Sequence, residues 1–213
     1  MTDEMREIIE RVLKMVSATD YIKPEDLPNI SLYMDQVTTF MEEQLSETKR
    51  YPDDKILTKT MINNYAKNKL LPPPDKKRYS REHLLLLIFI YYFKNILSIH
   101  DIQTLLGPIT ERYFQSGTDK NMSYIYKEIF DTIFAQTEYL KKDLLRGLSA
   151  AEKTFANAPS EDQPFLRDFS FICLLSFDVY MKKMLIENLI DGMQLPGEGK
   201  AKDRKRKAKE TLI

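Results

Sequence analysis

Ten consecutive apolar residues, Leu84–Phe93, constrain the fold of this 213-residue chain more than any other feature. The run follows Ser80, a residue suited to cap a helix, and stops at Lys94, which makes it far too short to span a bilayer. A helix that is apolar on nearly every side must be covered by other elements. Because the chain has only 6 glycines and its apolar residues follow helical spacing, the sequence predicts a mostly α-helical protein.

Apolar periodicity divides the chain into several expected helices. They cover residues 3–18, about 31 or 32 to 45, and 59–69. A helix capped by Ser80 then holds residues 84–97, and a short helix follows from Ser98 to about Leu106-Gly107-Pro108. Longer helices are expected over 121–156 and, from a capping box of Ser160 and Gln163, over 160–193. The sequence therefore predicts an N-terminal domain over 1–107, a long C-terminal helical hairpin for dimerisation or effector binding within 108–195, and a disordered basic tail over 196–213.

The formal net charge of zero conceals a strong local asymmetry. Residues 1–50 carry 11 acidic and 6 basic side chains, whereas residues 55–81 carry 8 basic side chains and the single acid Asp75. Contact with a polyanion depends on local charge, because counterion release follows the phosphates that are neutralised. The sequence indicates a polyanion-binding segment here, and a solvated basic surface without a partner is the alternative interpretation.

Residues 58–82 have the order of a short basic helix, a proline-stiffened wing and the start of a second helix. Thr58 is a suitable N-cap, and Pro72-Pro73-Pro74 ends the helix and forces an extended chain. A short wing or strand pair is expected to follow, before Ser80 caps the next helix. Helical spacing turns Met61, Ile62, Tyr65 and Leu70 inward, and it leaves on the outward arc Lys59, Thr60, Asn63, Asn64 and Lys67.

These outward residue types suit the major groove of DNA. Asparagine pairs bidentately with adenine, lysine reaches guanine or phosphate, and threonine meets either a base or a phosphate. The wing cations are expected to grip the DNA backbone, and Tyr79 either touches DNA or packs under the wing. The predicted DNA-binding residues are Thr58, Lys59, Thr60, Asn63, Asn64, Lys67, Lys76, Lys77, Arg78, Tyr79 and Arg81.

Three motifs carry a family resemblance: Lys69-Leu70-Leu71-Pro72-Pro73, Arg78-Tyr79-Ser80-Arg81-Glu82, and the segment Ser98–Leu106, which opens with Ser and ends in Leu-Leu. In this order they resemble the recognition helix, wing and following helices of MerR-type (mercury-resistance regulator) DNA-binding domains. The resemblance covers roughly residues 33–107. The chain also resembles a bacterial family of uncharacterised proteins, a domain of unknown function thought to contain this fold.

The MerR-like resemblance implies a winged helix-turn-helix with a small β wing, which binds double-stranded DNA as a homodimer. Three features depart from the family pattern. The connector over 46–57 is long, Lys69 replaces the usual Gly, and Asn63-Asn64-Tyr65 stands where Arg-Tyr-Tyr is usual.

We therefore expect a sequence-specific DNA-binding transcriptional regulator in a bacterial cytoplasm. The alternative is a protein-interaction adaptor that uses a MerR-like fold without binding DNA. A third interpretation is a small apolar effector bound among the aromatic residues of the C-terminal helices, namely Phe130, Phe134, Tyr139, Phe165, Phe169, Phe171, Phe177 and Tyr180.

Catalysis finds little support in the sequence. Cys173 has apolar neighbours and is expected to be a small core residue, and as a single cysteine it fits a reducing cytoplasm. His83 and His100 lie at expected helix starts, where capping or surface roles are usual. We expect no enzyme activity, no cofactor, no metal site and no membrane partner.

Overall fold

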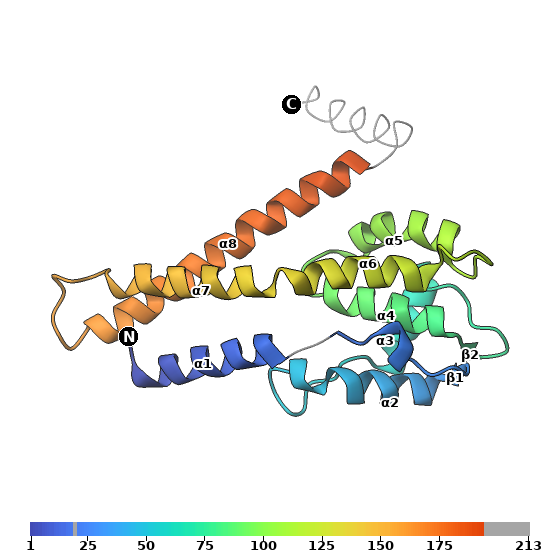
Figure 1. Ribbon diagram of the computed structural model, residues 1–213, viewed down its shortest axis with the longest axis horizontal. Helices are drawn as coiled ribbons and strands as arrows, with labels where there is room; N and C mark the ends of the chain where they lie inside the picture. The colour runs from blue at the N-terminus through green and yellow to red at the C-terminus, as the bar shows by residue number, and fades with distance from the viewer. Residues whose placement is uncertain (19–20, 194–213) are drawn as a thin grey trace, which may run out of the picture. The chain divides into compact units, whose positions relative to one another are not determined.

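The computed structural model describes residues 1–18 and 21–193, so the predicted basic tail over 196–213 lies outside the described residues. Helices dominate this part of the chain, as the sequence predicts, and one small sheet of two strands accompanies them (Figure 1). The elements are α1 Asp3–Ala18, η1 Pro24–Asp26, β1 Leu32–Tyr33, α2 Met34–Leu45, η2 Ser46–Thr48, α3 Lys59–Lys67, β2 Arg78–Tyr79, α4 Arg81–Phe93, α5 Ile99–Tyr113, α6 Met122–Ala135, α7 Thr137–Glu152 and α8 Gln163–Met193.

The chain forms two compact units. The first comprises Met1–Pro24 and Ile125–Lys183, and the second comprises Glu25–Tyr124 with the chain from Met184 onward. None of the helices within residues 1–18 and 21–193 has the length and apolarity needed to cross a membrane.

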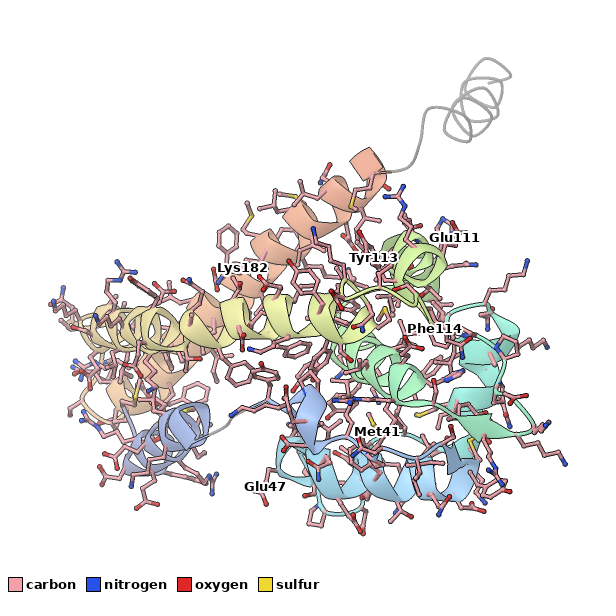
Figure 2. The ribbon with its side chains drawn as sticks, turned by 45° about the vertical axis from the view of Figure 1, so that its right-hand side comes forward. Met41, Glu47, Glu111, Tyr113, Phe114 and Lys182 are labelled. Atoms are coloured by element: carbon pink, nitrogen blue, oxygen red, sulfur yellow. The ribbon has the colours of Figure 1, made fainter. Side chains whose placement is uncertain are left out.

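Helix α4 lies in the core of the second unit. Every side chain from Leu84 to Ile90 is at most 4% exposed, as the sequence predicts for this run. Helix α5 and strand β2 pack on it. Val37 and Met41 of α2 are also fully buried, and Met41 is labelled in Figure 2. Ser80 caps α4 in a reciprocal capping box with His83, so the predicted cap is confirmed.

The two strands are antiparallel and pair residues far apart in the sequence. Leu32 lies opposite Tyr79, and Tyr33 lies opposite Arg78. Leu32 and Tyr79 are buried while Tyr33 and Arg78 are exposed, because successive side chains of a strand point to opposite faces. The prediction that a helix begins at residue 31 or 32 is therefore wrong. Pairing with β2 extends the backbone of Leu32 and Tyr33, and α2 begins at Met34.

The long connector between α2 and α3 is fixed on helix α4. Lys94 donates from Nζ to the backbone oxygen of Ile56 at 2.7 Å, and its pKa is lowered by burial. The hydroxyls of Thr48 and Tyr91 are hydrogen-bonded to each other. The side chains of Ile56 and Leu57 are buried, so the end of this polar segment joins the core of the second unit.

Helix α5 is longer than the sequence suggests. The expected end near Leu106-Gly107-Pro108 is wrong, because the helix continues through Pro108 to Tyr113. Proline lacks an N–H, so the helix loses the hydrogen bond to the carbonyl four residues earlier. Regular bonding continues to the end of the helix, where the N–H of Phe114 donates to the Thr110 oxygen at 3.1 Å.

The single helix expected over 121–156 is two helices. A tight turn at Gln136 separates α6 from α7, since the N–H of Gln136 donates to the Ile133 oxygen only three residues back, at 3.1 Å. Helix α8 begins at Gln163, and the expected capping box with Ser160 is wrong. The side-chain amide of Gln163 donates instead to the backbone oxygens of Ala158, at 2.9 Å, and Ala156, at 3.3 Å.

In the first unit, α1 packs along α7. Arg6 forms an ion pair with Glu152 at 2.7 Å, and the Thr2 hydroxyl donates to Asp168 at 2.6 Å. Tyr21 lies among the rings of Tyr126, Phe130 and Phe134, with centroid separations of 5.4 to 5.9 Å, and its hydroxyl donates to Asp131.

Candidate nucleic-acid interface

Helix α3 presents a polar face of five exposed residues. Thr58 caps the helix by accepting a hydrogen bond from the Met61 N–H at 3.1 Å, as predicted. The side chains of Ile62 and Tyr65 are buried. The predicted outward residues are all exposed; they are Lys59, Thr60, Asn63, Asn64 and Lys67. Asn63 lies one helical turn from both Lys59 and Lys67, so the three side chains form one row along the helix.

The two asparagines of this face differ in their hydrogen bonds. Asn64 accepts from the amide of Asn68 at Oδ1, at 3.0 Å. The side chain of Asn63 has no hydrogen-bond partner in the part of the chain that the structure describes. The amide of Asn63 therefore keeps both its donor and its acceptor available, as bidentate pairing with a base requires.

Lys59 is held by an acidic residue that the sequence analysis did not single out. Its Nζ forms an ion pair with Asp35, in the first turn of α2. The two side chains are 60% and 74% exposed. Exposed pairs of this kind contribute at most about 1 kcal/mol. A phosphate can therefore displace the carboxylate at little cost.

The tip of the wing is a turn in a conformation that lysine rarely adopts. The N–H of Arg78 donates to the Asp75 oxygen at 2.8 Å, which closes a four-residue turn. Its two central residues have positive φ, 47° at Lys76 and 65° at Lys77. This is the pattern of a type I′ turn, in which Asn-Gly is the usual pair. The left-handed conformation costs a residue with a Cβ roughly 1–2 kcal/mol, so the turn holds two exposed lysines at the expense of stability.

Lys69 explains one departure from the family pattern. Its φ is 56°, and it follows the C-cap residue Asn68 of α3. The N–H of Leu70 donates to the Tyr65 oxygen at 2.9 Å, and that of Lys69 to the Ala66 oxygen at 3.1 Å. Together these bonds make a Schellman motif, whose left-handed position is usually glycine.

Arg78 is fixed by a tyrosine on the neighbouring strand. Its Nε and Nη2 donate to the Tyr33 hydroxyl at 3.2 and 3.1 Å, and its guanidinium carbon lies 5.2 Å from the centre of the Tyr33 ring. Tyr33 was missed in the sequence analysis, because it faces Arg78 only through the pairing of β1 with β2. The only possible signal was an aromatic residue in an extended segment before α2.

The start of α2 thus contacts a cation from each half of the predicted interface. Asp35 contacts Lys59 of α3, and Tyr33 contacts Arg78 of the wing. Because Tyr33 and Asp35 are two residues apart, Lys59 and Arg78 lie on the same region of the second unit.

Three predicted residues are less accessible than the others, and one of them is Thr58, which is half-buried at the N-cap of α3. Tyr79 is only 4% exposed, with its ring edge-on to that of His83 at 5.4 Å, so it packs under the wing. Arg81 is half-buried in the first turn of α4.

His83 joins the wing to α4. It is 2% exposed, and its Nδ1 accepts from the Ser80 N–H at 3.0 Å. Its ring also contacts Phe114 edge-on at 4.9 Å. Burial lowers the pKa of His83 below its ordinary value of 6.5, although the nearby backbone of Pro72 and Pro73 acts in the opposite direction. A neutral ring whose Nδ1 accepts carries its proton on Nε2, which is buried and makes no hydrogen bond within the described residues.

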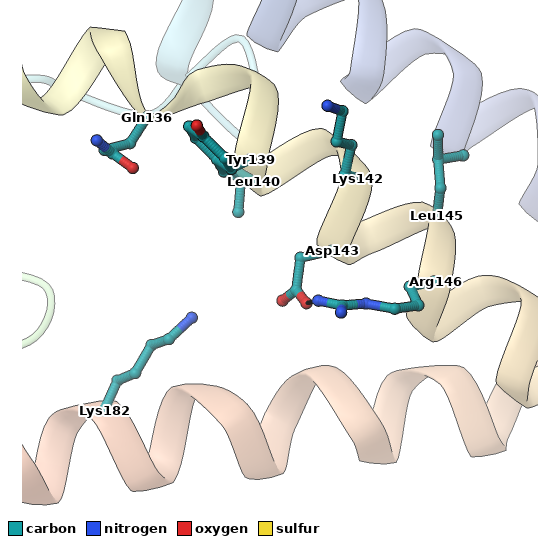
Figure 3. A pocket seen from close by; sticks show the side chains of 8 residues that line it. All are labelled: Gln136, Tyr139, Leu140, Lys142, Asp143, Leu145, Arg146 and Lys182. Atoms are coloured by element: carbon teal, nitrogen blue, oxygen red, sulfur yellow. Dashed lines mark hydrogen bonds and ion pairs between the residues drawn. The ribbon is translucent and has the colours of Figure 1, made fainter.

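A separate pocket of about 760 Å³ lies between α7 and α8 in the first unit (Figure 3). Of the aromatic residues that the sequence analysis assigned to a ligand pocket, Tyr139 lines this one. Three of its charged groups are already paired: Arg146 with Asp143 at 2.5 Å, and Lys182 with Asp178, which lies outside the lining, at 2.7 Å. Phe165, Phe169, Phe177 and Tyr180 are exposed on α8 and do not line this pocket. Cys173 is exposed as well, so the expectation that it is a core residue is wrong.

Comparison with known proteins identifies one family. Residues 22–129 match the family model described as a domain of unknown function, DUF1836, and because this match covers half of the chain, the protein belongs to that family. The matched segment contains α2, α3, the wing, α4 and α5. No curated protein and no solved structure matches the chain.

Proposed function

We propose that this member of the DUF1836 family is a sequence-specific DNA-binding transcriptional regulator that acts as a homodimer in a bacterial cytoplasm. In this proposal the region from β1 to α5 is a MerR-type winged helix-turn-helix, with α3 as the recognition helix and the segment from Pro72 to Tyr79 as the wing. The observation that carries the proposal is the contact of Lys59 and Arg78, one cation from α3 and one from the wing, with the start of α2.

The exposed face of α3 has the composition that base reading requires. Asn63 pairs with adenine in the major groove, and Lys59 and Lys67 on either side of it bind guanine or phosphate. Thr60 and Asn64 complete the face. No acidic residue lies on α3, so phosphates meet no repulsion from this helix.

The wing has the composition of a phosphate clamp. Lys76 and Lys77 are held at the tip of the turn in spite of its backbone strain, and strained backbone persists where the side chains serve a function. Arg78 is held rigid by Tyr33 and loses little conformational entropy when it binds. The left-handed Lys69 supports the MerR-type assignment, since glycine is usual at that position of the family motif.

The proposal is tested by fluorescence anisotropy with a random-sequence duplex across a salt series. Wild-type protein is expected to bind with micromolar affinity that falls steeply with salt. Replacing Lys76, Lys77 and Arg78 with glutamine is expected to remove up to about three units of the logarithmic salt slope, at about 0.9 per phosphate contact. The matched control replaces Lys142, Arg146 and Lys153, two lysines and one arginine exposed in the first unit, and is expected to bind as wild type does. A flat wild-type titration would favour the adaptor interpretation, and equal losses in both variants would exclude a wing clamp.

A second arm of this experiment separates base recognition by α3 from phosphate contacts by the wing. On a site selected from random duplexes, Asn63→Ala is expected to relax the preference at one base pair by about 1–3 kcal/mol. Lys77→Ala is expected to weaken all sequences alike and to reduce the salt slope by about one. Indistinguishable binding of wild type and both variants would overturn the assignment of α3 and the wing.

A further inference from the structure

Helix α8 carries large apolar side chains on its exposed side. Between its first turn and Met181, eight such residues are at least 40% exposed; they are Phe165 at 69%, Phe169 at 54%, Ile172 at 49%, Leu174 at 45%, Phe177 at 64%, Val179 at 61%, Tyr180 at 59% and Met181 at 40%. At the helical repeat, six of them, namely Phe165, Phe169, Ile172, Phe177, Val179 and Tyr180, share one side, called here the apolar arc of α8.

The charged residues of the same stretch, Arg167, Asp168 and Asp178, lie outside this arc, and two of them contact other parts of the first unit. Arg167 donates to the backbone oxygen of Thr154 at 3.2 Å, and the buried Asp168 accepts from Thr2. Lys182 extends toward α7 (Figure 3). A surface helix normally turns its apolar side to the core and its charges to water. Over this stretch α8 exposes its apolar arc and buries Asp168, so the apolar arc requires a cover.

We propose that the apolar arc of α8 is covered by the same arc of a second copy of this chain. This proposal rests on the homodimer of the proposed function and specifies its interface. The observations that support it do not involve DNA.

The exposed area is sufficient for a stable dimer. An aromatic side chain offers roughly 150–250 Å², so the exposed fractions of the six arc residues amount to on the order of 600 Å². Leu174 and Met181, at the edge of the arc, bring this to on the order of 800 Å². The largest apolar patch on an ordinary monomer is about 300–600 Å². One partner of a standard-size interface contributes about 800 Å².

The chemistry of the arc favours a second copy over a charged partner. Within the arc of residues 165–181 there is no charged side chain, so a basic or acidic partner would find no complementary group there. Homodimer interfaces are the most apolar class and resemble a domain core cut in half. A twofold arrangement places like apolar arcs against each other and leaves no charge buried.

The test is the molar mass of the full-length protein, measured by light scattering across a dilution series without DNA. Wild-type protein is expected at twice the 25.1 kDa of one chain. Phe169→Glu with Ile172→Glu is expected to yield monomers that keep the helical circular dichroism. The matched control is Tyr51→Glu with Ile30→Glu, which alters residues 56% and 69% exposed in the second unit and is expected to stay dimeric. A monomeric wild type, or a double variant in α8 that remains dimeric, would overturn the proposal.

Cys173 provides a second measurement that needs no destabilising variant. It is the single cysteine of the sequence, is exposed, and lies between Ile172 and Phe177 beside the apolar arc. Its reaction with a thiol reagent is expected to be slow at high protein concentration and to accelerate on dilution, as the dimer dissociates. A rate that does not depend on protein concentration contradicts the proposed interface. Because neither measurement uses DNA, failure of this proposal is distinguishable from failure of DNA binding.

Discussion

At the residue scale, the two lysines of the wing turn add positive charge but lower the stability of the fold. Lys76 and Lys77 occupy positions at which Asn and Gly are usual. Replacing them with Asn and Gly is therefore expected to raise the free energy of unfolding by roughly 1–3 kcal/mol, measured by chemical denaturation. The same change removes two phosphate contacts, so the affinity for DNA is expected to fall and the salt slope to drop by about two.

The control for this prediction separates charge from backbone strain. Replacing both lysines with glutamine removes the charges and keeps the strained backbone, so the loss of affinity should be the same without the gain in stability. An Asn-Gly turn that is no more stable than wild type would show that the turn is not strained.

The exposure and the capping role of single residues were predictable where a local sequence pattern, such as helical spacing, determines them. The five exposed residues of α3 follow from helical spacing, and Thr58 follows from capping preference. Tyr33 and Asp35 were not predictable, because each acts on a cation from a distant segment. Cys173 was predicted wrongly, since apolar neighbours indicate burial and α8 turns this side outward.

At the element scale, His83 connects the wing to α4 only while its ring is neutral. Its Nδ1 must accept the Ser80 N–H, and a protonated ring cannot accept. Because the pKa of His83 is lowered in the folded state, the unfolded chain binds this proton more tightly. The stability that this group contributes is full above pH 6.5 and is lost as the pH falls through the lowered pKa. The thermal midpoint is therefore expected to fall from neutral pH toward pH 5.

Two variants isolate this effect. His83→Gln keeps the residue type of a capping box but does not titrate, so the fall in thermal midpoint is expected to become shallower. His100→Gln replaces the other histidine, which is exposed, and is expected to keep the wild-type pH dependence. Glu82 shows a pKa raised by burial, which acts in the opposite sense, and it is common to all three proteins. Identical pH profiles for wild type and His83→Gln would exclude His83 as the titrating group.

The elements that the sequence predicts well are those with strong local signals. The apolar run and its Ser80 cap define α4, and Thr58 and the prolines bound α3. Strand β1 was not predicted because a strand of two residues is too short to show an alternating apolar pattern. Its extended backbone depends on pairing with β2. The end of α5 was misplaced because proline favours a helix boundary without requiring one.

At the scale of the whole molecule, the sequence does not reveal which distant segments pack together. The first unit combines Met1–Pro24 with Ile125–Lys183, two segments separated by most of the second unit. Local periodicity identifies their helices but not their association. The apolar residues of α8 are equally visible in the sequence, yet only the structure shows that they face outward while Asp168 of the same helix is buried and bonded to Thr2.

The two proposals together predict how dimerisation changes DNA binding. A dimer presents two copies of α3 to paired half-sites, so the second contact is intramolecular, and avidity of this kind is worth about 10²–10⁴ in affinity. Phe169→Glu with Ile172→Glu is therefore expected to weaken binding to a duplex with paired half-sites by at least about a hundredfold. Binding to a duplex with a single half-site should change little, because α3 and the wing are untouched. Anisotropy on the two duplexes measures both affinities, and an equal loss on each would show that α8 acts on the fold of the DNA-binding region and not through dimerisation.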